Sequence, residues 1–132
     1  MANPNIVNVT SILGTTTYYV PAGTAAVVLL ANTAASGLVY KINQIVCANV
    51  NGTSAVNATV AVYTNGAVAQ GGAPSGGTAY PVISTISVPA SASVIAVDKT
   101  TAIYLMEGTS ISVTSGTASG ISYTISYESI AS

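Results

Sequence analysis

Residues 94–129 read VIAVDKTTAIYLMEGTSISVTSGTASGISYTISYES, and the end of this stretch decides the fold class. From residue 121 to residue 128 every second residue is apolar and the residues between are polar. The apolar row is Ile121, Tyr123, Ile125 and Tyr127, and the polar row is Ser122, Thr124, Ser126 and Glu128. A period of two places the two rows on opposite faces of a β-strand. The stretch therefore predicts a strand with one buried face.

The same alternation occurs more briefly at residues 110–113, which read SISV. The segment between the two runs, residues 115–120, reads SGTASG, and glycine and serine are typical turn residues. Two alternating runs joined by such a segment predict a β-hairpin. Four of the five charged residues also lie in residues 94–129, where we expect them at turns and strand ends: Asp98, Lys99, Glu107 and Glu128.

The composition of the whole chain agrees with an all-β fold. Val, Ile and Thr make up 46 of 132 residues, and these β-branched types favour strands over helices. Good helix formers other than Ala are scarce. The pattern predicts eight to ten short strands with turns every eight to twelve residues. This spacing is typical of a two-sheet β-sandwich, of jelly-roll or immunoglobulin-like type.

Nine further strands are expected, over residues 6–13, 15–20, 25–31, 38–50, 56–62, 80–88, 94–97, 102–106 and 111–115. Gly14 is expected to end the first. Residues 25–31 have no polar alternation, which predicts a strand buried on both faces or one in a subunit contact. A break in period near Asn43-Gln44 predicts a bulge. The pair Asn51-Gly52 predicts a second hairpin, and the prolines at 81 and 89 suit an edge strand.

The domain organisation follows from the remaining segments. Residues 1–5 are expected to form an N-terminal arm because Pro4 blocks regular pairing, and residues 6–132 a single β-sandwich domain. The segment Thr64–Thr78 contains five glycines and is too long for an ordinary connection. It is either a functional projection or an ordered contact loop. We expect the arm, the loop or both to lie at contacts with neighbouring subunits.

The low number of charged residues and the short apolar runs limit the kinds of partner that the protein can bind. The chain has two Lys, no Arg and a net charge of −1, whereas nucleic-acid binding needs several cations on one face. The longest apolar run, residues 25–31, is too short to span a bilayer, and residues 1–9 do not resemble a secretory signal. We therefore expect no nucleic acid and no membrane partner. With charged residues at 4%, the surface of a lone molecule would be poorly protected against self-association.

No residue is expected to be catalytic, to bind a cofactor or to ligate a metal, and the protein is expected not to be an enzyme. The chain has no His, the commonest general base and metal ligand. Asp98 and Glu107 are interpreted as turn charges, and the glycines of residues 71–77 as a flexible or interface loop because no Lys follows them. Cys47 is interpreted as a small core residue.

The tyrosines leave an alternative open. Tyr123 and Tyr127 share a face with two isoleucines, so we expect them to pack in the core with their hydroxyls reaching the rim. Four others are less tied to apolar faces and could form a glycan-binding platform: Tyr18, Tyr19, Tyr63 and Tyr80.

From residue 38 onward the chain resembles small all-β virion structural proteins of tailed bacteriophages. The resemblance lies in Asn49-Val50-Asn51-Gly52 followed by a Val-rich strand, in residues 94–99 (VIAVDK), in residues 103–111 (IYLMEGTSI) and in residues 125–128 (ISYE). It implies a virion component made in the host cytoplasm, such as a capsid decoration or cement protein. The implied partners are further copies of the chain, as a homo-oligomer and specifically a trimer, and the major capsid protein. A neck, tail or fibre-tip component that binds a receptor or glycan is the alternative.

Overall fold

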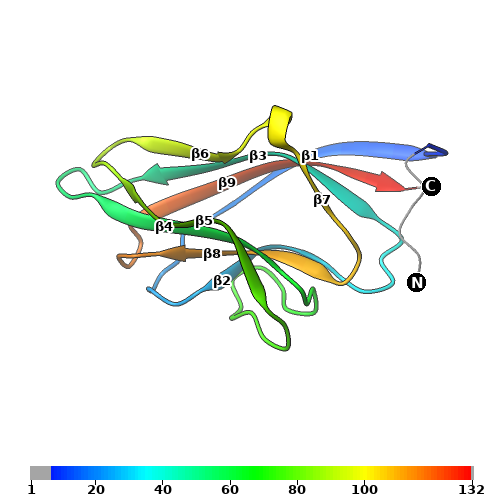
Figure 1. Cartoon of the computed structure of the whole chain (residues 1–132), viewed down its shortest axis with the longest axis horizontal. Coiled ribbons are helices and arrows are strands. Elements are labelled where there is room, and N and C mark those ends of the chain that lie inside the picture. Colours follow the sequence, from blue (N-terminus) through cyan, green and yellow to red (C-terminus); the bar gives the residue numbers. More distant parts are fainter. Residues whose placement is uncertain (1–6, 132) are drawn as a thin grey trace.

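The computed structural model describes residues 7–131, which form two antiparallel sheets packed face to face as a β-sandwich (Figure 1). Sheet A has the order β1-β9-β3-β6, with β7 also pairing β3, and sheet B has the order β2-β8-β4-β5. The strands are β1 (Ser11–Tyr19), β2 (Val27–Asn32), β3 (Val39–Asn49), β4 (Val56–Tyr63), β5 (Ala79–Val88), β6 (Ser93–Val97), β7 (Ile103–Leu105), β8 (Thr109–Ser115) and β9 (Ile121–Ala131). One 3-10 turn, η1 (Lys99–Thr101), precedes β7. The predicted all-β sandwich is confirmed.

Both predicted hairpins are wrong. The segment of residues 115–120 joins β8 in sheet B to β9 in sheet A, and residues 50–55 join β3 in sheet A to β4 in sheet B. In each case the two apolar rows face each other across the sandwich instead of lying side by side in one sheet. The reason is that alternation reports which face of a strand is buried, and it does not report which strand is the hydrogen-bonded neighbour.

The first strand also differs from the prediction. Strand β1 runs through Gly14 without interruption and pairs with β9 in one continuous register, from Ser11 opposite Ala131 to Tyr19 opposite Tyr123. A Cβ at Gly14 would meet nothing within 4 Å, so the glycine ends no structure here. Residue 6, where the strand was expected to begin, and the N-terminal arm of residues 1–5 lie outside the described residues.

Three strand predictions are confirmed. In β2, Val28 and Leu29 are adjacent and both are fully buried, so this strand is covered on both faces. In β3 the register with β9 shifts between Ile42 and Gln44, at the predicted bulge. Strand β5 forms the edge of sheet B, beyond β4.

The core between the sheets is made of the inward rows. From sheet A they include Ile42, Ile45, Cys47, Ile121, Tyr123 and Ile125, and from sheet B Leu29, Val56, Ala58, Val60, Ile111 and Val113. The accessible surface is 6321 Å², close to the roughly 6,300 Å² that area scaling gives for a chain of this mass.

Two buried asparagines tie loops to strands at the ends of β2 and β3. Asn32 donates to the carbonyls of Leu38 and Leu105, both at 2.9 Å. Asn49 donates to the carbonyls of Ser54 at 3.0 Å and Val88 at 2.9 Å. Each side chain therefore links its own sheet to a strand of the other sheet, and its burial is matched by hydrogen bonds.

Candidate functional site

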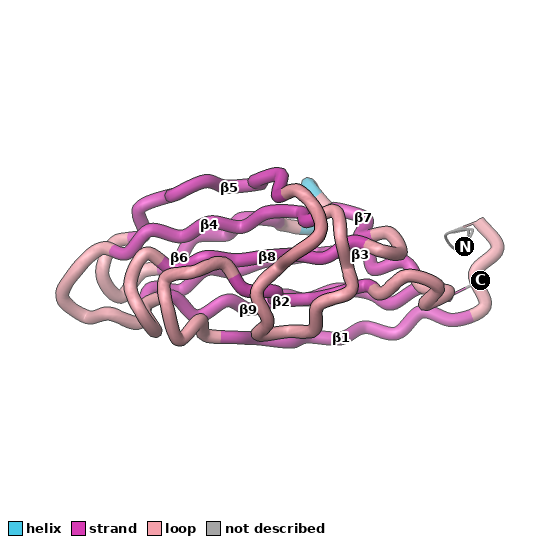
Figure 2. Tube along the Cα trace, turned by 90° about the horizontal axis from the view of Figure 1, so that it is seen from below, coloured by secondary structure: helices cyan, strands magenta, loops and turns pink. Residues whose placement is uncertain are grey.

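The glycine-rich segment Thr64–Thr78 lies against the outer face of sheet B, where Figure 2 shows loops crossing in front of the strands. Its two ends are joined by the Thr64 amide, which donates to the Thr78 carbonyl at 3.1 Å. The Asn65 amide nitrogen donates to the Ser75 carbonyl at 3.0 Å, and the Ser110 hydroxyl on β8 donates to the Asn65 carbonyl at 2.9 Å. The segment is thus fixed by its own chain.

The same segment covers the edge of strand β2. The Val28 amide donates to the Gly72 carbonyl at 2.9 Å, and the Gly71 amide donates to the Val28 carbonyl at 2.8 Å. Two adjacent loop residues exchange these bonds with one residue of β2, and Gly71 has a positive φ of 87°, which is the pattern of a β-bulge that begins with glycine in an antiparallel ladder. The segment therefore acts as a short extra strand on β2.

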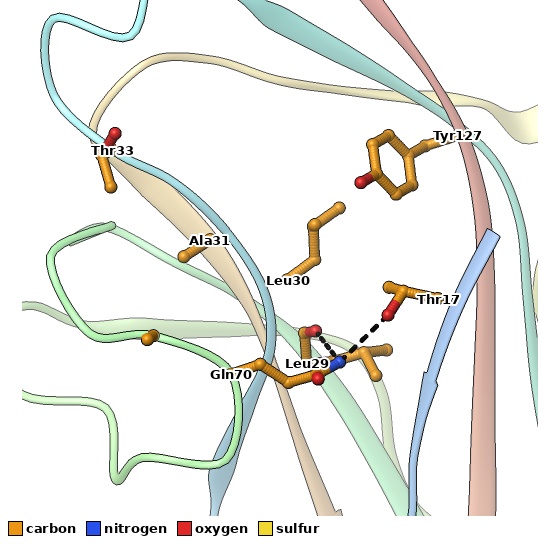
Figure 3. Close-up of a pocket in the computed structure, with 8 residues that line it drawn as sticks. Thr17, Leu29, Leu30, Ala31, Thr33, Gln70 and Tyr127 are labelled. Carbon is orange, nitrogen blue, oxygen red and sulfur yellow. Dashed lines mark hydrogen bonds between the residues drawn. The ribbon is translucent and has the colours of Figure 1, made fainter. Parts of the chain in front are cut away.

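Gln70 joins the two sheets on this side of the sandwich (Figure 3). Its amide nitrogen lies 2.9 Å from the Leu29 carbonyl of β2. The same nitrogen lies 3.3 Å from the Thr17 hydroxyl and 3.3 Å from the Tyr18 carbonyl of β1. One side chain from the loop therefore bridges the edge strands of both sheets.

A pocket of about 300 Å³ lies beside this bridge, between β1, β2, β9 and the loop (Figure 3). Its lining is Thr17, Leu29, Leu30, Ala31, Thr33, Ala69, Gln70 and Tyr127. The volume is at the lower end of the range for small-molecule sites, and a mainly apolar wall with a few polar groups is typical of such sites. This pocket is the candidate functional site.

Tyr127 forms one wall of the pocket. Its ring packs on Tyr40 of β3 with centroids 4.9 Å apart and an interplanar angle of 46°. Partial burial raises the pKa of Tyr127, with a smaller contribution from Tyr40, while a hydrogen bond with Thr15 opposes the rise. The hydroxyl is therefore neutral at pH 7 and can donate or accept a hydrogen bond.

Tyr123 lies deeper than the sequence predicts. Its ring is fully buried, and its hydroxyl does not reach the rim: it donates to the Thr114 carbonyl of β8 and lies 3.4 Å from the Thr59 carbonyl of β4. Burial is the main cause that raises its pKa. The core-packing prediction is confirmed, and the hydroxyl links β9 of sheet A to sheet B.

The four other candidate tyrosines are not gathered on one surface. Tyr18 on β1 is 72% exposed and Tyr80 on β5 is 61% exposed, but these strands lie at opposite edges of the sandwich. Tyr19 is half-buried against the core. Tyr63 is buried, and its hydroxyl donates to the Gly77 carbonyl and accepts from the Gly77 amide, both at 3.0 Å. A single platform made of these four tyrosines is therefore ruled out.

Asp98 and Glu107 lie at turns, as predicted, whereas Glu128 lies inside β9 and not at a turn or strand end. Asp98 accepts hydrogen bonds from the Thr100 hydroxyl at 2.5 Å and the Thr100 amide at 2.9 Å, which cap η1 and hold the pKa of Asp98 below its usual range. Glu107 accepts from the Gly37 amide at 3.1 Å. Within residues 7–131 no group of three or more His, Cys, Asp or Glu side chains is placed to hold a metal ion.

Cys47 and two glycines of residues 71–77 contact other parts of the same chain, which indicates structural roles. Cys47 is fully buried in β3, and burial raises the pKa of its thiol to about 12, so a thiolate is disfavoured at neutral pH. The Gly71 and Gly77 amides are bonded to Val28 and Tyr63 of the same chain. Cys47 is thus a core residue, as predicted.

Comparisons of the chain with family models, with curated proteins and with solved structures found no match. In the described part of the chain no helix is long and apolar enough to cross a membrane.

Sequence reasoning missed the two residues that define the site, Gln70 and Thr17. The available signal was weak: Gln70 is the one long polar side chain in the glycine-rich segment. A glycine-rich backbone can approach strands closely, and an amide can bond several carbonyls at once.

Proposed function

We propose that the protein is a non-enzymatic structural subunit of a virion, specifically a capsid decoration or cement protein that stabilises the shell through subunit contacts. The observation that carries the proposal is the surface. Large apolar side chains are exposed on four strands: Ile12, Leu13 and Tyr18 of β1, Tyr80, Val82 and Ile86 of β5, Ile95 of β6 and Tyr104 of β7. The chain has only five charged residues to keep such a surface apart from others.

A surface of this kind favours assembly over an isolated existence. Contiguous exposed apolar patches mark interaction sites, and β1 and β5 each carry three exposed apolar side chains. Stable subunit contacts bury about 800 Å² or more on each partner. The resemblance of residues 38–128 to bacteriophage virion proteins gives the kind of assembly. The expected partners are other copies of this chain and the major capsid protein, in a particle assembled in the host cytoplasm.

Co-sedimentation tests the proposal. Purified protein is mixed with particles that lack it, and the bound fraction is measured after centrifugation through a sucrose cushion. Saturable binding at a fixed number of copies per particle is expected. Protein that stays in the supernatant at tens of micromolar, while folded by circular dichroism, would refute a role on the shell.

A matched pair of variants on β6 sharpens the test. Ile95 and Ser93 are both exposed on one face of the strand, opposite Val46 and Ala48 of β3. Ile95→Lys removes an exposed apolar side chain, and Ser93→Lys adds the same charge two residues away. If β6 contributes to the shell contact, only Ile95→Lys weakens binding. Equal binding by both variants would assign the contact to another strand.

The pocket favours the second candidate, a neck, tail or fibre-tip component that binds a glycan. Apolar walls, the Tyr127 ring and the hydroxyls of Thr17 and Thr33 suit a sugar face with its hydroxyl groups. Saturation-transfer NMR with a panel of monosaccharides tests this function, with Tyr127→Leu as the variant that should lose the signal. The absence of saturation transfer from the protein to every sugar would remove this candidate.

A further inference from the structure

Five strands lie at the edges of the two sheets, and they differ in how they are protected. Strand β7, which pairs β3 beside β6, has only three residues. Strand β2 is covered by Gly71 and Gly72. Strand β5 carries Pro81, two register shifts and a positive φ of 47° at Thr85, and all of these interrupt a ladder. Strand β6 has only five residues. Strand β1 has nine residues, no proline, no charge and no register shift. Within residues 7–131, no strand pairs with its second edge.

The hydrogen-bond pattern shows which backbone groups of β1 bond β9 and which point away from the sheet at its open edge. Next to β9, the Gly120 carbonyl accepts from the Val50 amide just past the end of β3. Because N–H and C=O groups alternate sides along a strand, even-numbered residues of β9 bond β3 and odd-numbered residues bond β1. In β1 the odd-numbered residues therefore bond β9, and the even-numbered residues point outward. The Tyr18 carbonyl supports this assignment: it accepts a hydrogen bond from Gln70 of the loop, so it points away from β9.

The even-numbered residues also share one face of the sheet. Ile12, Gly14, Thr16 and Tyr18 lie opposite Ile130, Glu128, Ser126 and Thr124 of β9, on the side away from sheet B. Ile12 is 59% exposed and Tyr18 is 72% exposed. The row thus has an apolar residue at each end and two small residues in the middle.

We propose that two copies of this chain pair through β1, antiparallel, about a two-fold axis at Thr15, and so join two A sheets into one. In this register Ile12 lies opposite Tyr18 of the other copy, and Gly14 lies opposite Thr16. All four outward-pointing residues then exchange backbone hydrogen bonds. The Tyr18 carbonyl can accept a second bond because a carbonyl oxygen has two lone pairs.

A second copy suits this edge because the row is complementary to itself. An isologous contact requires that the same strand serves as both surfaces. Here the axis at Thr15 packs both exposed apolar side chains of the even-numbered row, Ile12 and Tyr18, on an apolar side chain from the other copy and brings no like charges together. The proposed dimer does not depend on the proposed function in a virion. It also differs from the trimer that the resemblance to virion proteins implies.

A charge swap at two exposed positions tests both the contact and its register. Gly14→Lys with Thr16→Lys places lysine opposite lysine twice in the dimer. The matched control, Gly14→Lys with Thr16→Glu, places lysine opposite glutamate twice. In both variants the lysine introduced at position 14 lies opposite Glu128 of its own chain. Each is checked for folding by circular dichroism and studied by sedimentation equilibrium.

The expected result is a native species of twice 13.0 kDa. The Lys/Glu variant should remain dimeric, and the Lys/Lys variant should dissociate with a Kd raised roughly tenfold or more above that of the Lys/Glu variant. A native chain that is monomeric or trimeric at tens of micromolar would overturn the proposal. Equal dissociation constants for the two variants would also overturn it, because the register pairs residue 14 with residue 16.

Discussion

Strand β8 lies in sheet B and strand β9 in sheet A, and both alternate apolar residues with Ser and Thr. The outward row of β8 contains Ser110 and Ser112, which are 0% and 4% exposed. The corresponding row of β9 contains Ser122, Thr124 and Ser126, which are only half-buried. The segment Thr64–Thr78 covers β8 at Ser110, whose hydroxyl donates to the Asn65 carbonyl. On the outer row of β9, burial is found at Ile130, which is 5% exposed, and not at these three polar residues. A polar row therefore identifies the outer face of a strand without showing that this face meets solvent.

The largest expected change in the free energy of unfolding comes from displacing the segment Thr64–Thr78 from sheet B. A Cβ at Gly66 would clash with the Asn32 carbonyl oxygen and would lie 2.7 Å from the Thr109 carbonyl oxygen. These are backbone atoms that cannot move aside, so Gly66→Ala should lift the loop from sheet B and lower the free energy of unfolding by about 3 kcal/mol or more. Urea denaturation measures the loss, and hydrogen exchange should show faster exchange on β8 than before.

Gly23→Ala is the control for this variant. A Cβ at Gly23 would meet nothing within 4 Å, so its effect should stay within about 0.5 kcal/mol. If Gly66→Ala is as stable as Gly23→Ala, the loop does not lie against Asn32 and Thr109 as described.

The next effect concerns the link from β9 to sheet B. Tyr123→Phe removes the hydroxyl that donates to the Thr114 carbonyl and should cost about 1–3 kcal/mol, because a buried acceptor loses its partner. Tyr127→Phe, on the same strand face but only half-buried, should cost less. Thermal and urea unfolding compare the two variants.

The burial of Tyr123 also predicts that the stability of the fold depends on pH. Burial raises the pKa of Tyr123 above its ordinary value of 10.0, so the folded state holds this proton more tightly than the unfolded state. Its contribution is fully present below about pH 10 and is lost as the pH rises toward the folded-state value. Tyr123→Phe should therefore show a shallower alkaline loss of stability than the native chain. Identical slopes between pH 9 and pH 11, measured by urea unfolding, would contradict the buried position.

A smaller effect compares the two serine rows directly. Ser110→Ala removes the hydrogen bond to the Asn65 carbonyl under the loop and should cost about 1 kcal/mol. Ser126→Ala removes an exposed hydroxyl that lies 3.0 Å from the Thr16 hydroxyl, and water can replace that partner, so the cost should stay below about 0.5 kcal/mol. Chemical denaturation of both variants checks the difference, and equal costs would remove the distinction between the faces.

The smallest effect is expected on the open face of sheet A. Lys41 and Glu128 form an ion pair at 3.9 Å, with side chains 29% and 37% exposed. Exposed pairs are screened by solvent, so Lys41→Met should change the free energy of unfolding by less than about 1 kcal/mol, and less still in high salt. A change that is large and independent of salt would show that this face is also covered.

The sequence predicted the class of fold, most strand positions, the bulge in β3 and the edge position of β5. These features depend on local patterns: alternation, proline and a break in period. It did not predict that β8 and β9 lie in different sheets, or that Gln70 bridges β1 and β2. Those features depend on contacts between segments far apart in the chain, and turn residues such as those at 115–120 suit a crossing between sheets as well as a hairpin.

The position of β9 between β1 and β3 has a consequence for how the chain folds during synthesis. Ser11 pairs with Ala131, so β1 must wait for a strand that is made much later in the chain. Until β9 has left the ribosome, β1 and β3 have no strand between them and sheet A cannot form. Pairing of segments this distant is intrinsically slow because the loop must close before any contact is gained. The sandwich can therefore be completed only once β9 is available, and the β-rich early segments remain exposed to one another until then.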